Sequence, residues 1–311
     1  MKLTPRAQSP NTAAELEGYD FFVAGLGYES RCIHAAQINA GRYTKGIAVS
    51  FPDRQVLSFE KNKLWFIASG FTLVSRVEDA VAALMDAGAV RILIDISSMS
   101  RPMMAALVRS LAVDFDTEMR VDFLYSPACY SIPGKGGKLQ TSSGPVSPSY
   151  AGWTDEPELP LCAFIGLGYE ADRALGVLEY LEPSAAWIFV PTSSDEPLEQ
   201  KKYDEAIQNN NSVLKNLIPD EQYIPYDVSR PFDVFVQLEA MVYGVLGRSR
   251  PLIAPFGPKL FALASILVGE IYHPSVTIWR ISAGRDGEPK DLEAMGPVYR
   301  LPVTFENADS V

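Results

Sequence analysis

The feature that most constrains this chain is an internal repeat. The segment DFFVAGLGYESR at residues 20–31 returns as LCAFIGLGYEAD at residues 161–172, at an offset of 161 − 20 = 141. The same offset carries the apolar run GIAVSF (46–51) onto WIFVPT (187–192), across an intervening stretch of helix length. An offset that holds across a helix without a gap predicts two diverged copies of one supersecondary unit.

The repeat continues beyond these segments with a wider offset. A later strand-and-helix pattern recurs so that Arg101 falls on Lys259, an offset of 259 − 101 = 158. The second copy therefore carries 158 − 141 = 17 extra residues. The two copies span roughly residues 20–126 and 161–281.

Each copy alternates short apolar runs with helix-length amphipathic segments, which predicts parallel strands joined by crossover helices. The expected strands of the first copy are residues 20–25, 46–51, 71–75, 91–96 and 121–126. Residues 77–88, with acids at the start and a glycine at the end, predict a helix. The fold class is therefore α/β, with two tandem, three-layer Rossmann-like halves that are related by internal duplication and a pseudo-twofold axis.

The expected domains follow from the repeat. They are a first copy at residues 1–128, a linker at 129–160, a second copy at 161–283 and a C-terminal tail at 284–311. The linker is rich in Gly, Pro and Ser, as loops are. The tail contains one further strand-like run, VYRLPVTF, to which the pattern assigns no place.

Charge and composition exclude several classes of function. A net charge of −11 argues against sequence-independent binding to nucleic acid, because an acidic surface repels the phosphate backbone. Two histidines and three scattered cysteines exclude a histidine-rich metal site and a disulfide framework, so no metal and no cofactor are expected. The absence of a signal peptide and of an apolar run of about 18 residues predicts a cytoplasmic protein without a membrane segment.

The first candidate site is the glycine turn after the first strand of each copy. It comprises Gly25, Gly27, Tyr28 and Glu29 in the first copy and Gly166, Gly168, Tyr169 and Glu170 in the second. Glycines permit a tight turn and a close approach of the backbone to an anion. The glutamates argue against a standard dinucleotide fingerprint, because they would repel a pyrophosphate, although they also suit a helix start. Binding of a ligand and simple turn geometry therefore stay open as alternatives.

The second candidate site follows the fourth strand of each copy. In the first copy it comprises Asp95, Ser97, Ser98, Ser100 and Arg101, and in the second Gly257 and Lys259. A cation at a helix start is locally unfavourable for the helix dipole, so its recurrence in both copies indicates a bound negative charge.

Further residues are weaker candidates. Arg31 and Arg173 follow the repeated glutamates and would either add charge to the site or pair with those glutamates. Asn62 and Asn211 recur before apolar helical stretches, as helix-face residues or readers of a base. Cys32 and His34 fall on different faces of a helix and are better explained as core or surface filler than as a catalytic pair. The glycine-rich segment 134–137 lacks the strand and the spacing of a P-loop and is better explained as a flexible linker.

The pattern at residues 95–107, and more loosely at 254–263, resembles the signature of CARF domains and of their fused-pair relatives, the SAVED domains. This resemblance implies a Rossmann-like sensor of cyclic oligonucleotides in prokaryotic antiviral defence. It also implies that the glycine turns line the ligand pocket. The family's paired glycines are replaced here by Ser98-Met99 and Phe256-Gly257.

We therefore expect a sensor or regulatory protein that binds a nucleotide or another small phosphate-bearing ligand and acts on a protein partner. One alternative is an enzyme that cleaves or transfers a nucleotide or nucleoside group, with Glu29 or Glu170 as base or nucleophile. The other is a protein interaction module with vestigial pockets.

Overall fold

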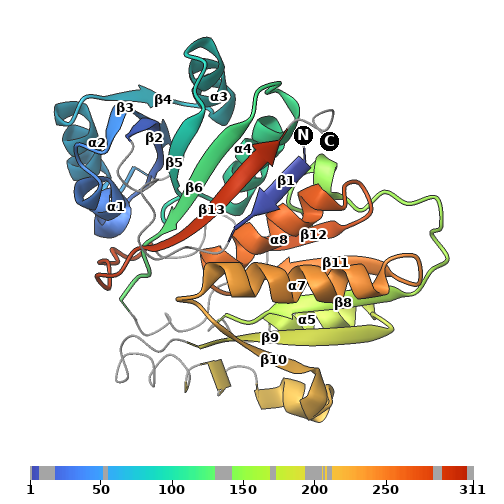
Figure 1. Cartoon of the computed structure of the whole chain (residues 1–311). Helices are drawn as coiled ribbons and strands as arrows, with labels where there is room; N and C mark the ends of the chain where they lie inside the picture. The colour runs from blue at the N-terminus through green and yellow to red at the C-terminus, as the bar shows by residue number, and fades with distance from the viewer. Residues whose placement is uncertain are drawn as a thin grey trace. The chain divides into compact units, whose positions relative to one another are not determined.

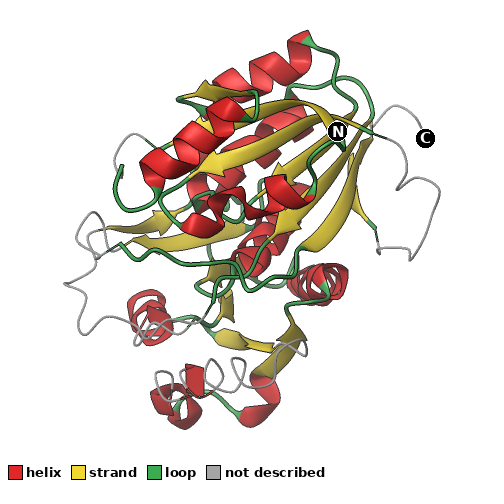
Figure 2. Ribbon diagram, turned by 90° about the vertical axis from the view of Figure 1, so that its left-hand side faces the viewer, coloured by secondary structure: helices red, strands yellow, loops and turns green. Residues whose placement is uncertain are grey.

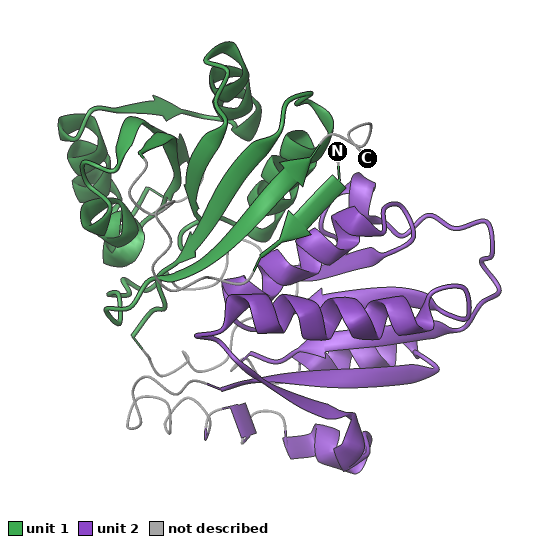
Figure 3. Cartoon of the chain, in the orientation of Figure 1, with its two compact units in different colours: residues 1–129, 289–311 green, residues 130–288 purple. Residues whose placement is uncertain are grey.

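The computed structural model describes residues 2–6, 18–51, 55–129, 142–168, 173–192, 205, 207–208, 212–282 and 289–306. The chain forms two compact units, each with its own sheet (Figure 3). Unit 1 comprises residues 1–129 and 289–311, and unit 2 comprises residues 130–288.

The sheet of unit 1 has seven strands in the order β1-β13-β6-β5-β2-β3-β4 (Figure 1). The strands are β1 (Lys2–Pro5), β2 (Tyr19–Leu26), β3 (Tyr43–Ser50), β4 (Phe71–Val74), β5 (Arg91–Asp95), β6 (Met119–Tyr125) and β13 (Tyr299–Glu306). Strands β4, β3, β2, β5 and β6 are parallel, whereas β13 is antiparallel to both β6 and β1. The five strands predicted for the first copy are these five parallel strands.

The sheet of unit 2 has six strands in the order β10-β9-β8-β11-β12-β7. The strands are β7 (Ser142–Pro145), β8 (Leu161–Gly166), β9 (Ala185–Thr192), β10 (Tyr223–Asp227), β11 (Arg250–Pro255) and β12 (Thr277–Ser282). All are parallel except β7, which pairs antiparallel with β12.

The parallel strands of the two units follow the same spatial order. Numbered within each unit, both run 3-2-1-4-5, which is the order of a Rossmann-type half. In each unit the first strand of the repeat lies beside the fourth, β2 beside β5 and β8 beside β11. The predicted fold class, two Rossmann-like α/β halves, is confirmed.

Helices cover both faces of each sheet, as Figure 2 shows. In unit 1 the helices are α1 (His34–Ile38), α2 (Phe59–Ala68), α3 (Val77–Asp86) and α4 (Arg101–Val113), with a 3-10 turn, η2 (Ser30–Ile33). Apolar residues of α1 and α2 pack with alternate residues of β2, among them Phe22 and Ala24, and α3 packs against α4. Parallel strands are buried on both faces in this way, which explains their nearly continuous apolar runs.

Unit 2 repeats this layering with different helices. They are α5 (Arg173–Leu181), α7 (Pro231–Val245) and α8 (Lys259–Ile271), with 3-10 turns η3 (Pro148–Tyr150), η4 (Ser212–Asn216) and η5 (Asp220–Gln222). Residues of α5 and η4 pack with alternate residues of β8, including Ala163 and Ile165, whereas α7 packs against α8. The α7–α8 pair thus takes the place that α3 and α4 have in unit 1.

Strands β1, β7 and β13 lie outside the repeat as the sequence delimits it, and two of them complete the sheets beside the repeated strands. Strand β13 comes from the predicted tail and joins unit 1, where Tyr299 pairs with Tyr125. Strand β7 comes from the predicted linker and joins unit 2, where Pro145 pairs with Trp279. Each sheet thereby gains an antiparallel strand beside its fifth parallel strand, because that edge would otherwise expose unpaired backbone groups.

Candidate functional site

The glycine turn and the helix start of each unit meet where the strand order reverses. Open parallel sheets bind ligands beyond the carboxyl ends of the strands at this switch point. In unit 1 Ala24 of β2 pairs with Asp95, the last residue of β5. In unit 2 Gly166 pairs with Pro255, the last residues of β8 and β11.

The two turns are in direct contact in both units. In unit 1 a Cβ atom on Gly27 would lie 3.1 Å from the Cβ of Ser98. In unit 2 a Cβ on Gly168 would lie 2.5 Å from the carbonyl oxygen of Phe256, and one on Gly257 would lie 2.3 Å from that of Leu167. The repeated glycines therefore allow the two turns to pack closely, most strictly in unit 2, and this turn geometry is one of the two explanations left open by the sequence.

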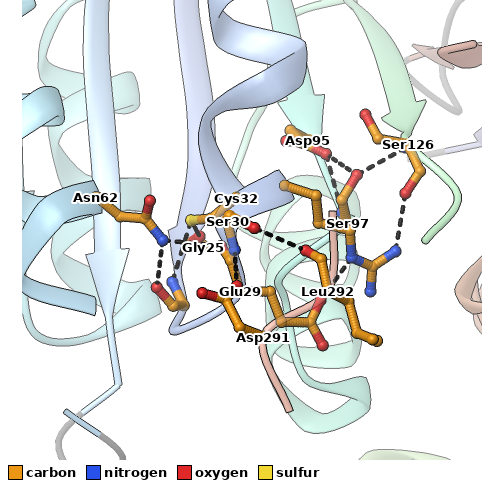
Figure 4. Close-up of polar contacts among 12 residues, drawn as sticks. Gly25, Glu29, Ser30, Cys32, Asn62, Asp95, Ser97, Ser126, Asp291 and Leu292 are labelled. Carbon is orange, nitrogen blue, oxygen red and sulfur yellow. Dashed lines mark hydrogen bonds and ion pairs between the residues drawn. The ribbon is translucent and has the colours of Figure 1, made fainter. Parts of the chain in front are cut away.

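Serine and aspartate side chains connect two strand ends in unit 1 (Figure 4). Asp95 is buried, and its Oδ1 accepts hydrogen bonds from the backbone N–H (2.9 Å) and the hydroxyl of Ser97. The Ser97 hydroxyl oxygen in turn accepts the N–H of Ser126, at 2.8 Å, just beyond β6. This chain of bonds fixes the end of β5 against the end of β6.

Arg31 extends the network to the glycine turn. Its guanidinium donates from Nε to the Glu29 carboxylate at 2.5 Å and from Nη1 to the carbonyl oxygen of Ser126 at 2.8 Å. Only 6% of the Arg31 side chain is exposed, against 18% for Glu29. Burial lowers the pKa of Arg31, but Glu29 and Tyr125 together outweigh burial, and the pKa is raised. Of the two roles predicted for Arg31, pairing with Glu29 is therefore the one observed.

Two buried side chains, Asn62 and Cys32, form hydrogen bonds with the backbone of the glycine turn in unit 1. Asn62 of α2 donates from Nδ2 to the carbonyl oxygens of Gly27 (3.0 Å) and Glu29 (2.8 Å). The Cys32 thiol donates to the carbonyl oxygen of Gly25 at 3.1 Å and accepts the N–H of Gly27 at 3.2 Å. Burial raises the pKa of Cys32 to about 12, so the thiol stays protonated and unreactive. Both residues thus have a structural role.

A segment of the predicted tail lies against this turn. Asp291 accepts the N–H of Ser30 at 2.5 Å (Figure 4). It also accepts the hydroxyl of Ser58 at 2.5 Å, and the carbonyl oxygen of Leu292 accepts the N–H of Arg31 at 3.1 Å. Partial burial raises the pKa of Asp291, but the donors from Ser58 and Ser30 outweigh it, and the pKa is lowered. His34, expected only as filler beside Cys32, contacts the carbonyl oxygen of Gly296 at 2.9 Å.

The cations of the second motif begin the two helices as predicted. Arg101 is the first residue of α4 and Lys259 the first of α8. Ser100 caps α4, because its hydroxyl accepts the N–H of Met103 at 3.2 Å, whereas Pro258 stands at the cap of α8. The two helix starts therefore share a cation but not a capping side chain.

Among the described residues, aromatic rings pack at the corresponding edge of unit 2. The Tyr226 ring stacks on that of Phe261 with centroids 5.3 Å apart, and Phe189 lies 5.1 Å from Phe261. The Phe261 ring lies directly against Gly166, where an added Cβ would be 2.4 Å from it. Gly166 thus makes room for a buried aromatic cluster.

The remaining predicted site residues have the following places. Tyr28 is half-buried and packs on the core of α1 and α2, and Arg173 begins α5. Tyr169, Glu170, Asn211 and the segment 134–137 lie outside the described residues. Ser126, Asp291 and Leu292 contact this turn but were not predicted from the sequence, because they belong to no repeat or motif.

Two kinds of site receive no support from the described part of the chain. Within it, no group of three His, Cys, Asp or Glu side chains is placed to hold a metal ion. No helix among the described residues is long and apolar enough to cross a membrane.

Comparison with known proteins does not identify a family for this chain. No family model and no curated protein matches the chain. A candidate universal stress protein from Pseudomonas aeruginosa UCBPP-PA14 aligns over 85% of this chain and 94% of its own, at 13% identity and a TM-score of 0.28. A functionally unknown protein from Pseudomonas aeruginosa PAO1 aligns over 84% and 92%, at 10% identity and a TM-score of 0.27. At TM-scores this low neither protein informs the ligand or the reaction of this chain.

Proposed function

We propose that this chain is a nucleotide-binding sensor or regulatory protein that binds the phosphate of its ligand at the starts of α4 and α8. One observation carries the proposal. In both units a basic residue, Arg101 or Lys259, begins the helix after the central strand, beside the glycine turn of the neighbouring strand. A cation at a helix start opposes the helix dipole, and a bound phosphate accounts for its recurrence.

The state of Glu29 favours a sensor over an enzyme for unit 1. A general base or nucleophile must reach the substrate, whereas the Glu29 carboxylate is held by the buried Arg31 at 2.5 Å. The enzyme alternative therefore depends on Glu170. The resemblance of residues 95–107 to CARF and SAVED domains makes cyclic oligonucleotides the first ligand class to test, with a protein partner as the receiver of the signal.

The experiment is a thermal-shift measurement with cyclic oligonucleotides, dinucleotides and nucleosides, combined with chromatography of the same mixtures. A ligand that binds only the folded state raises the melting temperature by linkage. Arg101→Ala and Lys259→Ala should each weaken binding by about 10- to 100-fold, because a charge-assisted contact contributes about 1.5–3 kcal/mol. Arg109→Ala, in the last turns of α4, is the matched control and should leave the shift unchanged.

The outcomes separate the three functions. A shift that Arg101→Ala and Lys259→Ala reduce, without chemical change of the ligand, supports the sensor. Turnover that Glu29→Gln or Glu170→Gln abolishes would establish the enzyme instead, since an amide cannot act as base or nucleophile. Neither shift nor turnover with any compound would favour the interaction module.

A further inference from the structure

The stretch of unit 1 that precedes β13 lies against the glycine turn of the same unit. We call residues 289–296 the strap. The carbonyl oxygen of Leu292 in the strap accepts the N–H of Arg31 at 3.1 Å and the hydroxyl of Ser30 at 3.3 Å. The ring of His34 contacts a carbonyl oxygen at the end of the strap, at 2.9 Å. The strap is therefore attached to the residues that directly follow the turn.

Backbone hydrogen bonds hold the strap on its other side. Cys129 donates its N–H to the carbonyl oxygen of Glu293 at 2.9 Å, and Met295 donates to that of Pro127 at 3.0 Å. These bonds do not involve the side chain of Asp291. The side chain of Asp291 can therefore change while the backbone bonds that place the strap remain.

The Asp291 carboxylate is held by groups that also bind phosphate. It accepts the N–H of Ser30 at 2.5 Å (Figure 4) and the hydroxyl of Ser58 at 2.5 Å. Partial burial raises the pKa of Asp291, but Ser58, Ser30 and the nearby Lys61 outweigh burial, and the pKa is lowered. An N–H group, a hydroxyl and an ammonium thus favour a negative charge at this point. Asp291 is exposed, so solutes reach its place from solvent.

The repeated glutamate does not prevent an anion from binding at this turn of unit 1. Its charge is neutralised by the buried Arg31, whose Nε lies 2.5 Å from the Glu29 carboxylate. The presence of the Asp291 carboxylate two residues along from Glu29's own side of the turn shows that a second negative charge is accommodated there. The objection to a phosphate that the sequence raised is therefore removed in this unit.

We propose that the turn of unit 1 carries an oxyanion-binding position, formed by Ser30, Ser58 and Lys61, which the chain fills with its own Asp291. The position lies at the switch point, where open parallel sheets bind ligands. A carboxylate or phosphate from solution must displace the Asp291 side chain. Its apparent affinity is therefore reduced by the fraction of molecules in which the position is vacant. Asp291 is an intramolecular competitor that keeps weakly binding anions out of the turn.

This inference goes beyond the proposed function and does not depend on it. The oxyanion position uses none of the contacts proposed for Arg101 or Lys259. The two proposals are tested with different solutes and different variants, so either can fail while the other stands.

The test is a titration of the full chain with sodium phosphate, and separately with sodium acetate, followed by thermal unfolding. Sodium chloride at the same ionic strength is the reference. Asp291→Ala should respond to phosphate at a concentration at least about tenfold lower than wild type, because the competitor is gone. Adding Ser58→Ala to this variant should reverse most of the gain. Acetate shows whether a carboxylate alone is sufficient.

Glu293→Ala is the matched control. It removes the same charge from the same strap, and Glu293 is exposed and bonded to Cys129 only through its backbone. Its response to both anions should equal that of wild type. Equal responses of wild type and Asp291→Ala, or a gain in Glu293→Ala of the same size, would overturn the proposal.

Hydrogen exchange resolved to single amides locates the bound anion. In Asp291→Ala the Ser30 amide should exchange faster than in wild type, and phosphate should slow it again. The amides of Cys129 and Met295 should keep their protection, since the strap stays in place. Stabilisation by phosphate without protection of the Ser30 amide places the anion elsewhere and contradicts the proposal. If Asp291→Ala does not fold, Asp291→Asn decides, with a smaller gain expected and no gain overturning it.

Discussion

The carboxyl edges of the two sheets share one strand order but are built from different chemistry. In unit 1 the edge is cross-linked by polar side chains, from Asp95 through Ser97 to Ser126 and Arg31. In unit 2 the turns pack backbone against backbone, with Gly168 on Phe256, over the rings of Phe261 and Tyr226. Topology brings the two turns together in each unit, but it does not determine what holds them there.

The two edges therefore depend on different kinds of interaction, a polar network in unit 1 and close backbone packing in unit 2. A network of paired charges stabilises only when every member is satisfied, so the edge of unit 1 is sensitive to the loss of any one partner. Close backbone packing is sensitive instead to added volume, because a carbonyl oxygen in a sheet-end turn cannot move aside as a side chain can. The two edges should therefore fail under different substitutions.

The largest expected effect is the removal of the buried cation in unit 1. Arg31→Met should lower the free energy of unfolding by about 3 kcal/mol, because it leaves Glu29 and the Ser126 carbonyl without their donor. Arg173→Met, at the more exposed start of α5, should cost less than about 1 kcal/mol. Chemical denaturation measures both, and equal losses would contradict the contrast between the two edges.

The converse experiment adds one methyl group to each glycine turn. Gly168→Ala should cost about 2 kcal/mol, since its Cβ would lie 2.5 Å from a backbone oxygen. Gly27→Ala should cost less than about 1 kcal/mol, because its nearest neighbour, the Ser98 Cβ at 3.1 Å, has to give way by only a few tenths of an ångström. Thermal unfolding of the two variants side by side decides the order, and a larger loss for Gly27→Ala would reverse the comparison.

Buried polar chemistry in unit 1 extends beyond the edge and makes its stability depend on pH. Tyr19 in β2 donates to the buried Asp122 of β6, and burial, followed by this carboxylate, raises the pKa of Tyr19 to about 12. Because the folded pKa lies above the ordinary value of 10.0, the stabilisation is complete below pH 10 and is lost as pH rises toward 12.

Between pH 10 and 11 wild type should therefore lose about 1 kcal/mol more than Tyr19→Phe, which has no phenol to ionise. Urea denaturation at both pH values gives the difference. Other groups that titrate in this range contribute equally to both proteins and cancel. The positions of unit 2 that match Tyr19 and Asp122 by the repeat offsets are Pro160 and Arg280, so no counterpart is expected there.

The smallest expected effect concerns the contact between Asp291 and the turn. Asp291→Asn should cost about 1 kcal/mol at pH 7, since the amide still offers one oxygen but loses the charge. The pKa of Asp291 is lowered from 3.8, so its contribution is present at neutral pH and is lost as pH falls below about 4. The difference between the two proteins should therefore shrink as pH falls below about 4. A difference that stays constant from pH 7 to pH 3 would show that the charge is not what matters.

Strands, helices and the duplication could be predicted because they depend on patterns within about 15 residues of the chain. The apolar run before Gly25 is buried as β2, and acids followed by a glycine delimit α3 as expected. The two glycine turns, 141 residues apart, lie at matching places in the two units. So do the basic residues that begin α4 and α8. The choice between a ligand site and turn geometry could not be made in this way, since both require the same glycines.

The sequence by itself determined the α/β alternation, the two copies and the positions of their turns, because hydrophobic periodicity and glycine conformation act locally. Only the tertiary structure decided the partners of these turns. Ser126 reaches Arg31 across 95 residues, and Asp291 reaches Ser30 across 261, because strand order and the return of β13 to unit 1 bring them together. No local pattern records such a pair, since each side chain carries only its own hydrogen-bonding capacity and the fold supplies the neighbour that satisfies it.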